Sequence, residues 1–357
     1  LEAKSQTGTS DFFKSGWMGS LILMISVALT CVAYWVAQNL TYLEEKNRFE
    51  YRTEEIRLAI IERMRVYEQA LYAGTAMMDS HGRKATRDHW KKFVAGLKIN
   101  SNWPGIQGLG FAVPVEVENK DSFERQIQQE GFSDFKIRPL EEREEYTSIV
   151  FLEPFDWRNK RAFGYDMWSN DMRREAMRRA KDEGVAATSG IITLVQETDT
   201  NVQKGFLMYL PLYDYDSENE SEQVGSLDLK KEKKFLGWVY AAFRANDLMK
   251  GILGEYDPSI EFEIYDGEKI EEESLLFDTD KIYSQGERSF EPIFFSQKAI
   301  ELQGRPWTLY FSTPVEFSIN EQNRSSQYVL VGGFIINALI FYLIYSLFSI
   351  NRKTYQL

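Results

Sequence analysis

One acidic side chain stands in an unusually apolar setting. Asp166 lies within the segment Phe163-Gly164-Tyr165-Asp166-Met167-Trp168. A carboxylate buried among such side chains is costly unless donors satisfy it. The donors could belong to a bound ligand. They could also belong to the protein, with Asp166 capping a helix or pairing with Arg173 or Arg174. Asp166 is therefore a candidate ligand-binding residue with a structural alternative.

Residue patterns that support catalysis are otherwise absent from the sequence. Its two histidines, His81 and His89, form no H-E-x-x-H motif, and neither G-x-S-x-G nor a P-loop occurs. The acidic run at 141–145 is expected to be a solvated loop rather than a metal site. We therefore expect no catalytic residues, no metal and no cofactor in this chain. Whether the whole protein is an enzyme stays uncertain, because an output domain could carry the activity.

Composition narrows the classes of partner. The chain has 357 residues, a net charge of −12 and a single cysteine, Cys31. It lacks the basic stripe of nucleic-acid-binding proteins, so we expect no nucleic-acid partner. One cysteine cannot form an intrachain disulfide, so the core must hold by packing. The aromatic residues, 24 Phe, 19 Tyr and 8 Trp, supply the apolar surface for it.

Two apolar segments bracket the polar part of the chain. Residues 17–38 and 328–350 contain no charged residue. Each is long enough to cross a hydrocarbon core of about 30 Å as a helix. We predict two transmembrane helices there, with the lipid bilayer as a partner, and one extramembrane domain at 41–325 between them.

Basic residues near the spans predict the orientation. Lys14 precedes the first span, and Arg352 and Lys353 follow the second, which favours both termini in the cytoplasm. We therefore expect a multi-pass protein of the inner (cytoplasmic) membrane whose central domain is periplasmic or extracellular. Residues 1–16 would be a cytoplasmic tail and residues 351–357 the start of a cytoplasmic region.

Periodicity predicts the elements of the central domain. Apolar residues at three-, four- and seven-residue steps over 43–78 predict a long amphipathic helix that continues from the first span. Further helices are expected at 86–99, 121–130, 170–183 and 245–253. Strands are expected at 106–113, 135–140, 147–154, 189–197, 205–213, 235–243, 259–267, 274–278, 289–296 and 305–313. Residues 214–234 form a charged insert. The fold class is mixed α/β (α+β) with antiparallel sheets.

Several segments, in order, resemble one sensor family. The most specific is RAFGYDMWSNDMRREAMRRAKDEGVAATSGIITLVQE at 161–197. Segments at 104–115 and 123–132 precede it, and segments at 204–213 and 235–254 follow it. Together they resemble the CHASE domain, an extracellular sensor module of plant cytokinin receptors and of many bacterial sensor kinases and cyclases. The resemblance covers about Glu54 to Ser312.

The resemblance implies an architecture. It implies a stalk helix at 43–100 followed by two PAS-like subdomains, a membrane-distal one at about 101–213 and a membrane-proximal one at about 235–313. Members of the family usually dimerise along the stalk, so a homodimer is the expected assembly.

The resemblance also implies a ligand site in the distal subdomain. In the cytokinin receptors, an aspartate just before a helix hydrogen-bonds the adenine ring, and Asp166 occupies the matching position. The other residues at matching pocket positions are Tyr165, Trp168, Phe111, Ala187, Thr188, Ser189, Leu207 and Tyr209. The plant pattern has a Pro-Phe pair where this chain has Gly190 and Ile191, so a cytokinin is not implied as the ligand.

The expected function is ligand sensing across a membrane. The chain would bind an unknown small molecule and signal to a cytoplasmic output domain, a histidine kinase of a two-component system or a diguanylate cyclase. The alternative is a membrane-anchored partner-binding or assembly protein that has a sensor-type fold and no small ligand. A polar-lined binding site at Asp166 favours the first interpretation, and a collapsed apolar one favours the second.

Overall fold

The computed structural model describes residues 16–81, 84–197, 202–214, 234–254, 260–279, 292–314 and 324–354. The chain forms two compact units. One unit comprises residues 1–52, 290–294 and 313–357, and the other comprises residues 53–289 and 295–312. Most of the charged insert expected at 214–234 lies outside the described residues.

The first unit contains the two apolar helices. They belong to α1 (Gly16–His81) and α8 (Arg324–Thr354), and both are long and apolar enough to cross a membrane. The polar groups of the two helices pair with each other. Asn337 Nδ2 donates to Thr30 Oγ1 at 3.0 Å, and Gln38 Nε2 donates to Ser326 Oγ at 3.2 Å. Such pairs are typical of helices that pack in lipid, where polar groups lack water.

In the second unit, α1 packs on one face of a large sheet. The predicted apolar stripe of α1 is buried here, at Ile60, Met64, Tyr67 and Leu71. The helix ends at His81, and α2 (Arg87–Leu97) follows after a capping box at Thr86. The stalk expected at 43–100 is therefore two helices, because the sequence between them provides a helix stop and a new cap.

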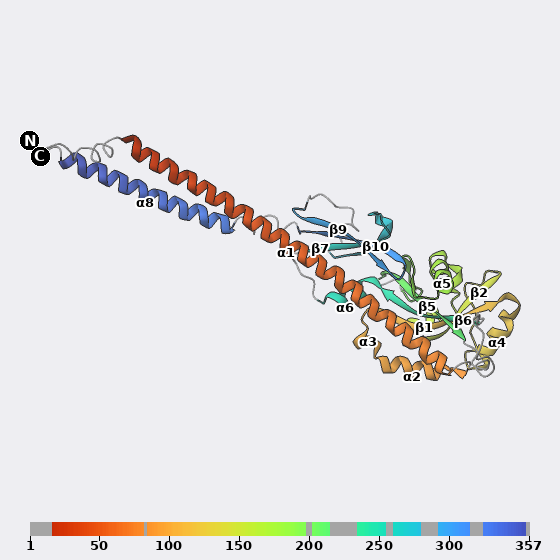
Figure 1. The fold of residues 1–357 in the computed structure, drawn as a ribbon. Coiled ribbons are helices and arrows are strands. Elements are labelled where there is room, and N and C mark those ends of the chain that lie inside the picture. Colours follow the sequence, from red (N-terminus) through yellow and green to blue (C-terminus); the bar gives the residue numbers. More distant parts are fainter. Residues whose placement is uncertain are drawn as a thin grey trace, which may run out of the picture. The chain divides into compact units, whose positions relative to one another are not determined.

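The large sheet has six antiparallel strands in the order β2-β1-β6-β5-β3, with β4 also paired to β5. Figure 1 shows helices on both sides of it. Its strands are β1 (Ile106–Glu116), β2 (Glu145–Glu153), β3 (Ala187–Thr188), β4 (Ile192–Thr193), β5 (Lys204–Asp214) and β6 (Lys234–Arg244). The helices that follow or precede these strands are α3 (Ile99–Asn102), α4 (Lys120–Gln129), α5 (Asp171–Glu183) and α6 (Ala245–Leu253).

Strand β6 differs from its expected place. We expected it to open the membrane-proximal subdomain, yet it lies between β1 and β5 in the middle of the large sheet. Residues 237–244 are buried throughout, as befits a central strand with helices on both faces. Local pattern predicts such a strand but not its partners.

The second sheet has four strands in the order β8-β7-β10-β9, all antiparallel. These are β7 (Glu261–Asp266), β8 (Leu275–Asp278), β9 (Phe295–Leu302) and β10 (Arg305–Ser312). Of the strand expected at 289–296, residues 289–291 lie outside the described residues, and β9 begins only at Phe295. The strand expected at 135–140 is absent. There the Ile137 amide donates to the Glu124 carboxylate at 2.9 Å instead of to a strand.

Candidate functional site

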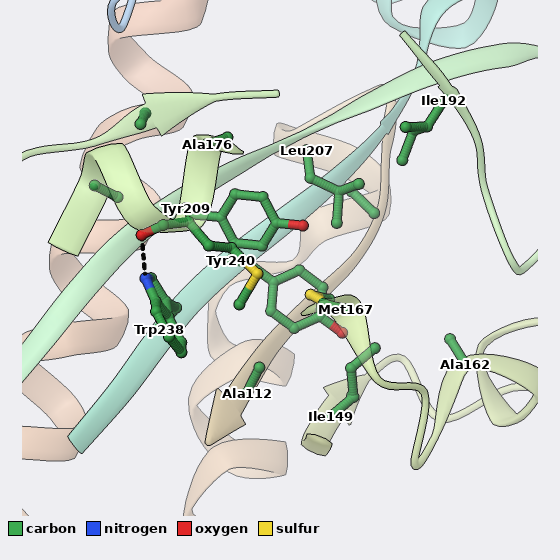
Figure 2. Close-up of a cluster of buried hydrophobic side chains, with 14 of the residues drawn as sticks. Ala112, Ile149, Ala162, Met167, Ala176, Ile192, Leu207, Tyr209, Trp238 and Tyr240 are labelled. Atoms are coloured by element: carbon green, nitrogen blue, oxygen red, sulfur yellow. Dashed lines mark hydrogen bonds between the residues drawn. The ribbon is translucent and has the colours of Figure 1, made fainter. Parts of the chain in front are cut away.

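Two tyrosines form the centre of the candidate site. Tyr209 on β5 and Tyr240 on β6 are direct partners in the antiparallel register, with ring centroids 6.1 Å apart. Both side chains are fully buried. Figure 2 shows the two rings side by side on one face of the sheet, with their hydroxyl oxygens pointing the same way into the cluster. We call this face, which carries Tyr209, Tyr240 and Trp238, the α5 face.

A glycine on the neighbouring strand makes room for one of these rings. Gly110 on β1 is paired with Tyr240. A Cβ at Gly110 would lie 2.6 Å from two atoms of the Tyr240 ring. This position requires a residue without a side chain because the ring occupies the space above it.

Helix α5 covers the two tyrosines. It begins at Asp171, directly after the N-cap residue Asn170, whose side chain accepts from the Arg173 amide at 3.1 Å. Its buried face carries two alanines, Ala176 and Ala180, which let the helix lie close to the sheet. The Trp238 indole donates to the Met177 carbonyl at 2.9 Å and ties the helix to β6.

Arg173 brings a cation to the α5 face. It is 4% exposed, and its guanidinium lies 4.7 Å from the Tyr165 ring centroid. Its only side-chain hydrogen bond within the described residues is a long one, 3.4 Å to the Thr193 carbonyl, and its Nε has no partner there. Within the described residues, no carboxylate forms an ion pair with it.

The two tyrosine hydroxyls also lack partners within the described part of the chain. Burial raises the pKa of both far above the ordinary value, while the positive charge of Arg173 acts in the opposite direction on both. Both hydroxyls are therefore protonated at neutral pH and available as donors. Arg173, Tyr209 and Tyr240 form what we call the tyrosine–arginine group.

Asp166 is satisfied by the protein itself. Its side chain is fully buried. Oδ1 accepts from the Thr147 amide at 2.8 Å, the Thr147 hydroxyl at 3.2 Å and the Trp168 amide at 3.1 Å, and Oδ2 accepts from Arg143 at 3.2 Å. Asp166 caps a helix, as the structural alternative predicts, and the helix is the short one at Met167–Ser169. Its ion-pair partner is Arg143 and not Arg173 or Arg174.

Burial nevertheless dominates the ionisation of this carboxyl group. It raises the pKa of Asp166 above the ordinary value, although the three hydrogen bonds from Thr147 and Trp168 and the charge of Arg143 lower it. Asp166 therefore anchors β2 to the segment before α5. Its charged partner Arg143 is partly exposed, at 21% of its side chain, so a ligand that binds Asp166 would compete with Arg143.

The other predicted residues divide between the two faces of the sheet. Ala187, Leu207 and Tyr209 belong to the cluster on the α5 face, and Tyr165 and Trp168 pack against it. Ser189 bridges β3 and β5, because its hydroxyl accepts from the Leu207 amide at 2.9 Å and donates to the Gly190 carbonyl at 2.9 Å.

Phe111 and Thr188 lie away from this cluster. Phe111 alternates with Ala112, which faces α5, and its ring lies 6.1 Å from that of Phe151 beside α2. Thr188 alternates with Ala187 in the same way, and its hydroxyl has no partner in the described residues. The prediction therefore joined residues from both faces.

Sequence reasoning missed Tyr240 and gave Arg173 only a structural role. The signal for Tyr240 was present, because strict alternation in 235–243 places Trp238 and Tyr240 on one face. Its pairing with Tyr209 follows only from the sheet register. For Arg173, the helix period places it on the face that also carries Ala176 and Ala180.

A surface hollow lies elsewhere in this unit. It has a volume of about 400 Å³ beside α2 and is lined by Arg87, Trp90, Phe151 and Lys160 among others. Arg87 there lies over three phenylalanine rings and pairs with Glu130 at 3.0 Å. Its charge is thus already compensated, unlike that of Arg173.

The α5 face is linked to the second sheet by a junction of polar contacts. Asp266 on β7 forms a two-pronged ion pair with Arg305 on β10, at 2.6 and 2.8 Å, and accepts from the Ile191 amide at 2.9 Å. At the turn between β9 and β10, the Gln303 carbonyl accepts from the Thr188 amide at 3.1 Å. Displacement of the link between β3 and β4 would therefore act directly on the second sheet.

The described residues contain no group of three or more His, Cys, Asp or Glu side chains that could hold a metal ion. Donors rather than metal ligands dominate the α5 face.

The CHASE domain family model matches residues 83–277, which is more than half of the chain. The chain belongs to the CHASE-domain family. CHASE domains are extracellular sensor domains of membrane receptors, and the two candidate spans flank this one. The stretch matched by the CHASE model includes both the α5 face and the start of the second sheet.

Two solved structures are among those that match this chain. One is the periplasmic sensory domain of the Campylobacter jejuni chemoreceptor Tlp1, at 8% identity and a TM-score of 0.46, covering 79% of this chain and 99% of that one. Another is the extracellular domain of the putative histidine kinase soHK1S-Z6, at 11% identity and a TM-score of 0.38, covering 78% of this chain and 98% of that one. A search of curated proteins finds no match.

Proposed function

We propose that this CHASE domain binds a small extracellular ligand on the α5 face and passes the signal across the membrane to a cytoplasmic output domain. The observation that carries the proposal is the tyrosine–arginine group. Buried polar groups are almost always hydrogen-bonded in native proteins. A buried cation without a carboxylate partner and two buried hydroxyls without hydrogen-bond partners, all judged among the described residues, mark a place where a ligand supplies the missing contacts.

The polar junction offers a route from the ligand to the rest of the domain. The ligand would contact β5, β6 and α5, and β3 lies directly beside β5. Through Asp266 and Arg305, movement there would reach β7 and β10. A ligand shifts such an equilibrium only by the difference in its affinity for the two states. The output domain would be a histidine kinase or a diguanylate cyclase.

We place the CHASE domain in the periplasm or outside the cell, with α1 and α8 crossing the inner membrane and both termini in the cytoplasm. Lys14, Arg352 and Lys353 support this orientation. The apolar windows of both helices have a mean hydropathy of 2.1 and are almost wholly unburied by protein.

A homodimer through α1 completes the proposal. Large apolar side chains at multiples of seven residues are solvent-exposed on this helix: Tyr51 at 70%, Leu58 at 51% and Tyr72 at 47%. Seven-residue spacing aligns side chains into a coiled-coil seam. In a Cys31→Ser background, Tyr72→Cys is expected to form crosslinked dimers in membranes. Crosslinking no stronger than at the exposed, off-seam position Glu62 would contradict this assembly.

A thermal-shift screen of the full chain in lipid nanodiscs tests sensing. Adenine derivatives, amino acids and organic acids are suitable compounds. We expect at least one to stabilise the domain, and to change the rate of crosslinking through α1 in membranes. A screen without any stabilising compound, together with a tightly bound protein partner, would instead support the assembly role. Crosslinking rates that ignore the ligand at every tested position would refute transmission.

A further inference from the structure

The tyrosine–arginine group indicates the kind of ligand as well as its presence, because the group combines hydrogen-bond donors with one positive charge. Arg173 is a cation and cannot be deprotonated in a protein. Tyr209 and Tyr240 present hydroxyl groups whose deprotonation burial opposes. All three therefore offer donors, and none offers a negative charge to a ligand.

No carboxylate among the residues that the structure describes compensates the charge of the group. A buried guanidinium requires an opposite charge or a full set of acceptors. Arg173 has one long hydrogen bond to a carbonyl and a contact with the Tyr165 ring. The buried carboxylate of Asp166 already accepts bonds from Thr147, Trp168 and Arg143.

We propose that the ligand is a small organic monocarboxylate whose carboxyl group binds Arg173 and accepts hydrogen bonds from the hydroxyls of Tyr209 and Tyr240. This inference rests on the proposed function and names the ligand class for the same site. A carboxylate matches the planar fork of a guanidinium and has free acceptor positions for two hydroxyl donors.

The residues around the group determine how many charges the ligand carries and which substituent its carboxylate has. One buried cation compensates one negative charge, so a phosphate dianion or a dicarboxylate would bring an excess. The side chains beside the tyrosines are apolar, and Figure 2 shows Leu207, Met167 and Ile149 on the side to which the hydroxyls point. The substituent of the carboxylate is accordingly an alkyl or aryl group.

Pairs of compounds that differ only in charge test the inference. Propionate, benzoate and phenylacetate are compared with propionamide, benzamide and phenylacetamide, using thermal shift and calorimetry on the full chain in nanodiscs. Each amide keeps the shape of its acid and loses the charge. We expect at least one acid to bind and its amide to bind about 10- to 100-fold more weakly.

Variants locate the effect. Tyr209→Phe and Tyr240→Phe remove only the hydroxyls and are each expected to weaken binding of the acid by about 10-fold or more. Tyr67→Phe is the matched control. Tyr67 is also fully buried, but it lies in α1 and its hydroxyl donates to the Pro104 carbonyl. We expect this change to leave affinity unaltered.

The outcomes separate the two claims. Acids that bind equally well to wild type and to both Tyr→Phe variants, or amides that bind as tightly as acids, would overturn the carboxylate inference and leave sensing intact. If neither the acids nor the amides bind up to about 10 mM, the carboxylate inference fails. Sensing itself then stands or falls by the broader screen. Affinity for the acids that is unchanged in Arg173→Gln would equally overturn the carboxylate inference.

Discussion

Removal of the two unpartnered hydroxyls should stabilise the ligand-free domain. Most substitutions of buried residues destabilise a protein, so this sign is unusual. Tyr209→Phe and Tyr240→Phe keep the ring, its packing and the 6.1 Å pairing of the two centroids. They remove only a polar group that has no partner within the described residues.

The magnitude follows from the cost of an unsatisfied buried group, about 1–3 kcal/mol. For a domain of this size, each kcal/mol corresponds to a shift of about 2–4 °C in Tm. Each Tyr→Phe change should therefore raise Tm by at least about 2 °C. The protein is first dialysed extensively to remove bound small molecules. Thermal unfolding of the full chain in detergent is then monitored by near-ultraviolet circular dichroism.

The control has the opposite sign. Tyr67→Phe removes a satisfied hydroxyl, which donates to Pro104 at 2.5 Å, and leaves that carbonyl without this donor. It should lower Tm by about 2 °C or more, from a loss of about 1 kcal/mol. If Tyr209→Phe and Tyr240→Phe also lower Tm, their hydroxyls have partners in the folded protein, such as ordered water, and the reasoning that leads from them to a ligand is refuted.

Three further changes test other parts of the account. Because burial raises the pKa of Asp166 above its ordinary value of 3.8, the free energy of unfolding should fall as pH rises from that value through the folded-state pKa. Asp166→Asn should flatten that part of a pH–stability profile, and an unchanged profile would contradict the burial of this carboxyl group. Gly110→Ala should destabilise the domain by about 1–3 kcal/mol by overpacking against the Tyr240 ring and should weaken ligand binding. A Tm equal to that of wild type would show that the ring has room to move. Glu197→Ala removes a buried partner that lies 2.7 Å from Arg244 and should cost about 3 kcal/mol. Asp247 also pairs with Arg244, and a loss below about 1 kcal/mol in urea unfolding would indicate that the remaining partners of Arg244 compensate its charge.

Much of the fold could be predicted because its signals are local. The apolar spacing along α1, the cap at Asn170 and the alternation in β5 all appear within short windows of sequence. Strand pairing is different. The place of β6 between β1 and β5 depends on contacts between residues more than a hundred positions apart, such as Gly110 and Tyr240, and no local pattern encodes them.

The candidate site shows the same division. That Asp166 needs donors was evident from its neighbours, whereas the donors themselves, on Thr147 and Arg143, lie 19 and 23 residues away. The family resemblance predicted a site that includes Tyr209 and Leu207, and the structure places both of them on the α5 face. The resemblance did not reveal that Phe111 faces the other way, because alternation along β1 separates Phe111 from Ala112 but does not say which of the two faces α5.

Hydrogen exchange of the full chain in nanodiscs, with and without the compound that gives the largest thermal shift, tests the central claim most directly. The account predicts slower exchange of amides in α5, β5 and β6 when the compound is bound, with a smaller change at the β9–β10 turn beside Thr188. Exchange that is unchanged on the α5 face, or slowed only at the hollow beside α2, would contradict it.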